Sequence, residues 1–284
     1  MAPTVLGKYN SSITRVRPFF WKLLAQDAMG NTWLPPLLAA APRGQEWASN
    51  CGAILPGCLE RRPYTDKVWR QQIRLEACFE REAPPPVRFL EWLIRHPLNL
   101  TWPAKWKCKE ETRVWRERLL GMHGDGEMER AMKTALAGLR ERGAAGSRRR
   151  WWSFEGFTSV DCCLETDRLV LFVEGKRTEP LAVATEWYPW RSQLLRNLET
   201  AAELAHGKQF AVLVLAEQRL PDLSPQDIAA GLPHLRRAER ASLLGHYLGC
   251  LLWPEACEAT GISYASLPYT RAAAATESTE PVKT

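Results

Sequence analysis

The stretch TSVDCCLETDRLVLFVEGKRTEP, residues 158–180, decides the fold of this chain. Residues 169–173 are large or β-branched apolar side chains, a run that is typical of a strand buried on both faces. The preceding segment SVDCCL is also apolar, and the polar residues 165–168 between the two indicate a reversal. We therefore expect a hairpin of two buried strands.

Three charged side chains, Asp161, Glu174 and Lys176, interrupt this apolar hairpin. Glu174 and Lys176 are two residues apart, so strand alternation points both to the same side of the sheet. The hairpin would bring Asp161 beside Glu174. Two adjacent carboxylates repel unless a cation lies between them, and oxygen ligands without a His or Cys partner suit Mg²⁺ or Mn²⁺.

The segments around the hairpin complete an α/β pattern. Apolar residues in 191–205 recur at helical spacing and define one buried stripe. The segment QFAVLVLA, residues 209–216, is typical of a buried strand, and a helical crossover before it is what a parallel βαβ unit requires. Upstream, Asp125 can cap a helix whose apolar residues recur through 128–139. The expected order is helix, strands, helix, strand.

An Asp in one strand followed by Glu-x-Lys in the next resembles the PD-(D/E)XK nuclease superfamily, which has the restriction-endonuclease-like fold. The resemblance covers residues 109–220, and Val160-Asp161 stands where that family usually has Pro-Asp. It implies an α/β core of helix, three strands, helix and strand, with a mixed central sheet flanked by helices. It also implies a metal-dependent nuclease that hydrolyses phosphodiester bonds, with DNA as the expected substrate.

The resemblance assigns roles to the charged residues of the hairpin. Asp161, Glu174 and the backbone carbonyl of Gly175 would hold Mg²⁺ or Mn²⁺, which polarises a phosphate oxygen and lowers the pKa of a bound water. Lys176 would orient or deprotonate the attacking water and offset charge in the transition state. The alternative is a surface hairpin in which Glu174 and Lys176 form an ordinary same-face pair.

Two further positions are candidates by the same resemblance. The family carries a Glu on the first core helix, for which Glu129 or Glu127 near the helix start, or Glu117 farther back, are the candidates. Glu129 with Lys133 also forms an i, i+4 pair typical of a solvated face. Gln193 resembles the glutamine that some of these nucleases carry on the helix after the Lys strand. A surface amide is the alternative for Gln193.

Composition favours a nucleic-acid partner. Lys and Arg total 38 against 32 acidic residues, a net charge of +6. Arg148, Arg149 and Arg150 precede the Asp161 strand and could neutralise phosphates, with a solvated turn as the alternative. Arg191 follows the aromatic run WYPW, whose rings could stack on unpaired bases or pack in the core.

The 284 residues fit one or two domains. We expect an irregular, mainly helical part over 1–108, with short helices at 19–28, 64–81 and 87–96. A nuclease-like core with C-terminal helices, one of them carrying the apolar residues of 243–251, is expected over 109–264. The residues 265–284 have the composition of a disordered tail.

The chain lacks the roughly eighteen consecutive apolar residues that span a bilayer, and it has no leader pattern, so a cytoplasmic protein without a membrane partner is expected. The eight cysteines are then thiols, with zinc at Cys51, Cys58, Cys78 and Cys108 as an alternative. Two other functions stay open: a catalytically inactive nuclease fold that binds nucleic acid or a partner protein, and an interaction scaffold. Double-strand cutting would call for a homodimer with two sites.

Overall fold

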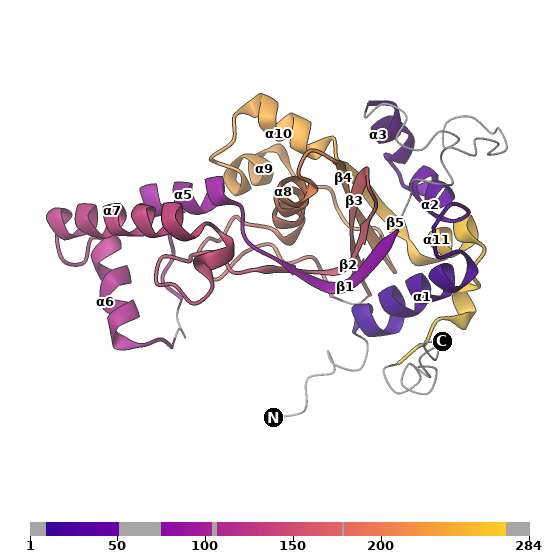
Figure 1. Ribbon diagram of the computed structural model, residues 1–284, viewed down its shortest axis with the longest axis horizontal. Helices are drawn as coiled ribbons and strands as arrows, with labels where there is room; N and C mark the ends of the chain where they lie inside the picture. The colour runs from indigo at the N-terminus through magenta and orange to yellow at the C-terminus, as the bar shows by residue number, and fades with distance from the viewer. Residues whose placement is uncertain (1–9, 51–74, 104–106, 178, 271–284) are drawn as a thin grey trace.

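The computed structural model describes residues 10–50, 75–103, 107–177 and 179–270. Its centre is a five-stranded sheet in the order β1-β2-β3-β4-β5 (Figure 1). The strands are β1 Glu76–Ala83, β2 Thr158–Glu165, β3 Leu169–Lys176, β4 Gln209–Ala216 and β5 Tyr247–Leu252. The first three strands pair antiparallel and the last three parallel. The expectation of an α/β fold with a mixed sheet flanked by helices is confirmed.

Helices cover both faces of the sheet and extend beyond it. They are α1 Arg17–Gln26, α2 Leu34–Ala40, α3 Gly44–Asn50, α5 Val87–Arg95, α6 Glu110–Leu119, α7 Asp125–Arg142, α8 Gln193–Ala205, α9 Pro225–Gly231, α10 Arg237–Leu244 and α11 Trp253–Thr260. In the described part of the chain, no helix combines the length and apolarity needed to cross a membrane.

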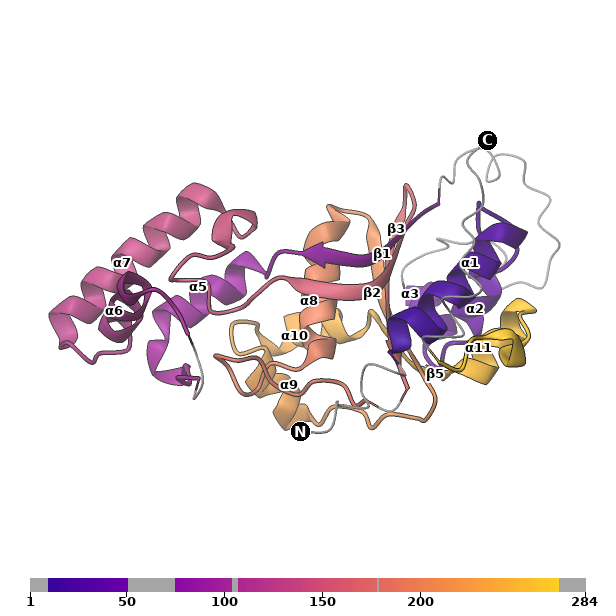
Figure 2. The ribbon, with the colours of Figure 1, turned by 90° about the horizontal axis from the view of Figure 1, so that it is seen from below.

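Two apolar cores lie on the two faces of the sheet. On one face, α1, α2 and α11 pack against alternate residues of β2 to β5. On the other face, the apolar stripe of α8 packs against the intervening residues, together with side chains from the α9–α10 region. A third core joins α5, α6 and α7 into an arm that projects from the sheet (Figures 1 and 2).

The predicted hairpin and crossover are present. β2 and β3 pair antiparallel with Cys162 opposite Val173, and all eight residues of β3 are buried. α8 then crosses over to β4, which pairs parallel with β3 over its whole length. α8 begins at Gln193 because the Ser192 hydroxyl accepts a hydrogen bond from the Leu195 amide, an N-cap. α7 begins at Asp125, with Gly124 rather than Asp125 in the N-cap position.

The sequence did not predict the two outer strands. A helix was expected over 64–81, but 76–81 belong to β1, while 64–74 lie outside the described residues. Alternation explains the strand: Ala77 and Phe79 pack on the α1 face, and Cys78 between them is exposed. The helix expected through 243–251 is also wrong, because α10 ends at Leu244 and 247–252 form β5 beside β4.

The first 108 residues contribute directly to the sheet and its cover, through β1 and through α1 and α2. The helices expected at 19–28 and 87–96 are present as α1 and α5. Of the tail expected over 265–284, Leu267 is buried against the α1 face, and the residues from 271 onward lie outside the described part.

Candidate active site

Asp161 sits at an irregularity in the sheet. The pairing of β2 with β3 ends at Cys162 opposite Val173, and Val160 and Cys163, three residues apart, contact the same core. Regular alternation is therefore broken at Asp161. Its carboxylate oxygen Oδ2 accepts a hydrogen bond of 2.8 Å from the backbone amide of Gly175 on β3. This hydrogen bond holds the Asp161 side chain against the neighbouring strand.

Glu174 is buried in a ring of donors. Its Oε1 accepts a 2.7 Å hydrogen bond from Gln193 Nε2 and lies 2.9 Å from Lys176 Nζ. Its Oε2 accepts a 3.1 Å hydrogen bond from Asn197 Nδ2. Because Gln193 and Asn197 are four residues apart on α8, the two amides lie on one helix face and reach both oxygens of one carboxylate.

Gly175 allows the end of β3 to pack closely against its cover. A Cβ at this position would lie 2.3 Å from Val16 Cγ2 and 3.3 Å from the Trp253 ring, so only a hydrogen fits. Trp253 Nε1 also donates to the carbonyl of Lys176 at 3.0 Å. The Glu-Gly-Lys sequence therefore has a packing reason for its middle residue, and the Lys176 side chain is itself about nine-tenths buried.

The surroundings of the site disfavour the ionised forms of both carboxyl groups, Asp161 and Glu174. Burial, and then the negative charge of Glu174, raise the pKa of Asp161 to about 7, although the Gly175 amide and the Lys176 ammonium oppose this shift. Burial also raises the pKa of Glu174, against the opposing effects of Lys176, Asn197 and Gln193. Two carboxyl groups with raised pKa values and one nearby amine are typical of sites that bind a cation or transfer a proton.

Gln193 links the loop before α8 to the site. Its backbone amide donates to Ala182 O at 2.7 Å, its Oε1 faces the Ala182 amide at 3.4 Å, and its Nε2 faces Glu174. The structure thus places Gln193 in contact with Glu174. Asn197 was not predicted as a site residue, although its place four residues after Gln193 on the polar face of the helix was a usable signal.

Glu129 is not brought to the site. It lies on α7 in the projecting arm, with a side chain that is 69% exposed and 3.9 Å from Lys133 Nζ. Figure 1 shows α7 in the arm, to one side of the sheet. The i, i+4 surface pair that the sequence offered as the alternative is the arrangement observed.

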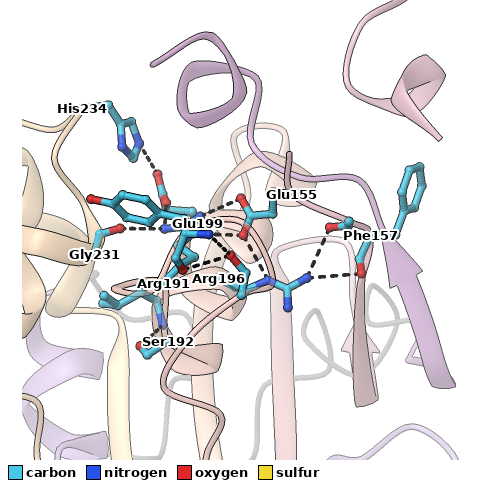
Figure 3. Close-up of polar contacts among 12 residues, drawn as sticks. Glu155, Phe157, Arg191, Ser192, Arg196, Glu199, Gly231 and His234 are labelled. Carbon is cyan, nitrogen blue, oxygen red and sulfur yellow. Dashed lines mark hydrogen bonds and ion pairs between the residues drawn. The ribbon is translucent and has the colours of Figure 1, made fainter. Parts of the chain in front are cut away.

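Arg191 is buried and belongs to an internal ion network (Figure 3). Its Nε lies 3.0 Å from Glu155 Oε1, its Nη1 pairs with Glu199, and its guanidinium lies 4.0 Å from the centre of the Phe89 ring. His234 Nε2 lies 2.6 Å from Glu199 at the far end of the network. The predicted nucleic-acid contact of Arg191 is therefore wrong, because this guanidinium is enclosed by its partners.

The aromatic run before Arg191 divides between core and surface. Trp187 and Tyr188 are buried, and the Tyr188 hydroxyl donates to Ala230 O at 2.7 Å. Trp190 is exposed over 56% of its surface. Core packing therefore accounts for two of the three aromatic rings.

Arg148, Arg149 and Arg150 are all exposed. The Arg148 guanidinium lies 4.1 Å from the centre of the Phe157 ring and 2.7 Å from Glu82. Phe157 directly precedes β2 and stands four residues before Asp161. In the described part of the chain, the side chains of Arg149 and Arg150 have no ion-pair partner, so their charges face solvent.

The described residues contain no cluster of three or more His, Cys, Asp or Glu side chains that could hold a metal ion. A cation at Asp161 and Glu174 would therefore complete its coordination with backbone carbonyls, water or substrate oxygens, as Mg²⁺ commonly does. No family model, curated protein or solved structure matches the chain. The interpretation of this site therefore comes from its own residues.

Proposed function

We propose that this chain is a metal-dependent nuclease of the PD-(D/E)XK type, with a restriction-endonuclease-like core and DNA as its substrate. The observation that carries the proposal is the meeting of Asp161, Glu174 and Lys176 at neighbouring positions of β2 and β3, with Gly175 donating to Asp161. Cysteine and histidine are missing from this set, so its donors are hard oxygens suited to Mg²⁺ or Mn²⁺.

The residues would share the work as follows. Asp161, Glu174 and the Gly175 carbonyl hold the cation, which when bound polarises a phosphate oxygen and acidifies a water. Gln193 and Asn197 keep the Glu174 carboxylate oriented. Lys176, released from its ion pair with Glu174, orients the attacking water and offsets the charge that develops on the phosphate.

The raised pKa values explain why a cation would bind here. Without one, burial and mutual repulsion leave Asp161 with a pKa of about 7, so near neutral pH it holds a proton for much of the time. A divalent cation would replace that proton and relieve the repulsion between the two carboxylates.

The solvent-facing arginines support a nucleic-acid substrate. Arg149 and Arg150 are exposed beside the lead into β2, and Arg148 stacks on Phe157 in the same segment. Arg196 of α8 donates to the carbonyls of Gly156 and Phe157, so this lead is tied to the helix that carries Gln193. Phe157, on which Arg148 stacks, stands four residues before Asp161 along the chain.

The test is a cleavage assay with supercoiled, linear and single-stranded DNA and with RNA, each in Mg²⁺, Mn²⁺ or EDTA. Cutting that needs the metal, and that is abolished in Asp161→Ala and Lys176→Ala, supports the proposal. Lys133→Ala, which removes a lysine with an 82% exposed side chain on α7, is the matched control and should cut normally. Cutting that persists unchanged in Lys176→Ala would come from a contaminant.

One observation favours the inactive-module alternative. Glu174 already has donors on both oxygens from Gln193, Asn197 and Lys176, so the fold satisfies this carboxylate without a cation. A protein that binds DNA but does not cut in either metal, and whose affinity is unchanged by Asp161→Ala, would be such a module. If the protein neither binds nor cuts DNA or RNA, the interaction scaffold is the function that agrees with the result.

A further inference from the structure

Two cysteines face each other across the edge of the sheet. In the register of β1 with β2, Cys78 is directly opposite Cys163. Directly opposed residues of antiparallel strands have Cα atoms about 4.5 or 5.5 Å apart and point to the same face of the sheet. Both separations lie in the range of about 4.4–6.8 Å that a disulfide spans. Cross-strand bonding therefore needs little movement of the backbone.

The two thiols differ in access. Cys78 is exposed on the outer strand, whereas Cys163 is fully buried beside the α8 core. The Arg81 Nη1 lies 3.6 Å from the Cys163 sulfur and also binds Glu165 at 2.8 Å. An oxidant in solution can thus reach Cys78 first, while Cys163, in contact with the Arg81 guanidinium, is shielded from it.

We propose that Cys78 and Cys163 form a thiol modification site, at which a peroxide oxidises the pair to a cross-strand disulfide. The inference is independent of the proposed nuclease activity, since neither cysteine is among the candidate cation ligands. The bond would attach the outer strand β1 to β2, the strand that carries Asp161 two residues away.

The chemistry balances in two steps. The Cys78 thiolate attacks one oxygen of hydrogen peroxide, the O–O bond breaks, and the products are a sulfenic acid and hydroxide, which takes up a proton as water. The sulfur of Cys163 then attacks the Cys78 sulfur, the S–O bond breaks, and a second water leaves with the Cys163 proton. Two thiols are oxidised and one peroxide is reduced.

Cys162 is the neighbour from which the pair must be distinguished. It is adjacent in sequence to Cys163 but buried in the core of the opposite face, with α1, α2 and α11. Its partner across the strands is Phe79. Of these two adjacent cysteines, Cys163 is therefore the one that shares a face with Cys78.

The experiment treats the reduced full-length protein with hydrogen peroxide, alkylates the remaining thiols and measures intact mass and linked peptides. We expect a mass lower by two hydrogens before alkylation, two fewer alkylated thiols than in the reduced protein, and a fragment spectrum joining Cys78 to Cys163. Cys162→Ser should keep the link, and Cys78→Ser and Cys163→Ala should abolish it. The oxidised wild type should also melt at a higher temperature than the reduced protein. Adding a reductant should return the melting temperature to that of the reduced protein.

Three results would overturn the proposal: a link that survives in Cys163→Ala, a Cys78 that oxidises only to sulfinic acid, or a product that is a dimer on a non-reducing gel. Circular dichroism of each variant checks its folding. Because the fragment spectrum is taken on the wild type, the assignment does not depend on the buried variant being stable.

Discussion

The ionised carboxylate of Asp161, which the proposed cation site needs, is costly to bury in the folded protein. A carboxyl group in an unfolded chain has a pKa of about 3.9, whereas in the folded protein that of Asp161 is raised to about 7. The folded state therefore binds the proton more tightly. The tighter binding of this proton stabilises the folded state in full below the unfolded pKa, and this stabilisation disappears as the pH rises through about 7.

Asp161→Asn should consequently stabilise the metal-free protein at alkaline pH. The amide keeps an acceptor for the Gly175 N–H but carries no charge that must be buried. We expect a gain on the order of 2–4 kcal/mol in the free energy of unfolding at pH 8, which shrinks to near zero at pH 4. Urea unfolding at both pH values, in EDTA, measures it. A variant less stable than the wild type at pH 8 would contradict the buried-charge account.

Protonation of Asp161 should also make the binding of a cation depend on pH. Because Mg²⁺ or Mn²⁺ has to displace the proton of Asp161, affinity should increase from pH 6 to pH 8, and binding at pH 6 should release close to one proton. Calorimetry in two buffers with different ionisation enthalpies measures that release. Asp161→Asn should bind the metal weakly, and with no release assignable to this group. An affinity independent of pH would exclude Asp161 as a ligand.

At the scale of single elements, α8 contributes more than an apolar stripe. One polar face holds Glu174 through Gln193 and Asn197, and another carries Arg196 and Glu199 into the ion network of Arg191. Periodicity in the sequence predicted the stripe correctly. It could not predict that both polar faces are covered, because the cover comes from β3, from the segment before β2 and from α5, all remote in sequence.

Asn197→Ala should therefore cost more than an ordinary amide substitution. It leaves Glu174 Oε2 buried without its donor, which costs about 1–3 kcal/mol of stability. Denaturant unfolding measures this decrease. Asn99→Ala, an exposed amide next to α5, is the matched control and should change stability by less than about 0.5 kcal/mol. Equal effects of the two substitutions would show that the hydrogen bond of Asn197 is weak.

Arg191→Met tests the ion network in the same way. Removing the guanidinium leaves Glu155 and Glu199 buried without their shared cation, and breaking such a pair costs about 3–5 kcal/mol. Thermal unfolding at neutral pH should show a large decrease in stability, whereas Arg130→Met, at a position with a 69% exposed side chain, should show little. A variant of Arg191 that folds as stably as the wild type but no longer binds DNA would contradict this structural role and indicate a nucleic-acid contact instead.

The outer strands show where interpretation from sequence failed. β2, β3 and β4 were predicted because long apolar runs are unambiguous. β1, with the sequence EACFEREA, lies at the edge and is half polar, so its charged residues resemble those of a surface helix. β5 follows directly from a helix, and its apolar residues in 247–251 fit a helical stripe as well as a strand; pairing with β4 decides for the strand.

At the scale of the whole molecule, the sheet carries the candidate site and the arm of α5, α6 and α7 projects beside it (Figure 2). The exposed arginines 148–150 lie on the chain between the arm and β2. A duplex or single strand lying along this junction would contact both parts. The sequence predicted the basic cluster but not its place at the root of a projecting arm, because the arm is defined by packing between α5 and α7, which are separated in sequence.

Replacing Arg149 and Arg150 together by Gln should weaken DNA binding without regard to its sequence. Removal of each phosphate-binding charge should reduce the slope of log affinity against log salt by about one, so the double variant should have a slope smaller by about two. Fluorescence anisotropy over a salt series measures the slope. Arg130→Gln, on the outer part of α7, is the control and should leave it unchanged. An unaltered slope in the double variant would show that Arg149 and Arg150 do not contact the phosphates of the nucleic acid.

Gly175 sets a rule for how this chain can vary. Because Val16 occupies the space that a methyl group would need, position 175 can accept alanine only if residue 16 becomes smaller in the same protein. Descendants of this sequence should therefore show linked replacements at two positions that are far apart along the chain. A lone change at 175 should be eliminated by selection wherever the spacing of its charged neighbours matters.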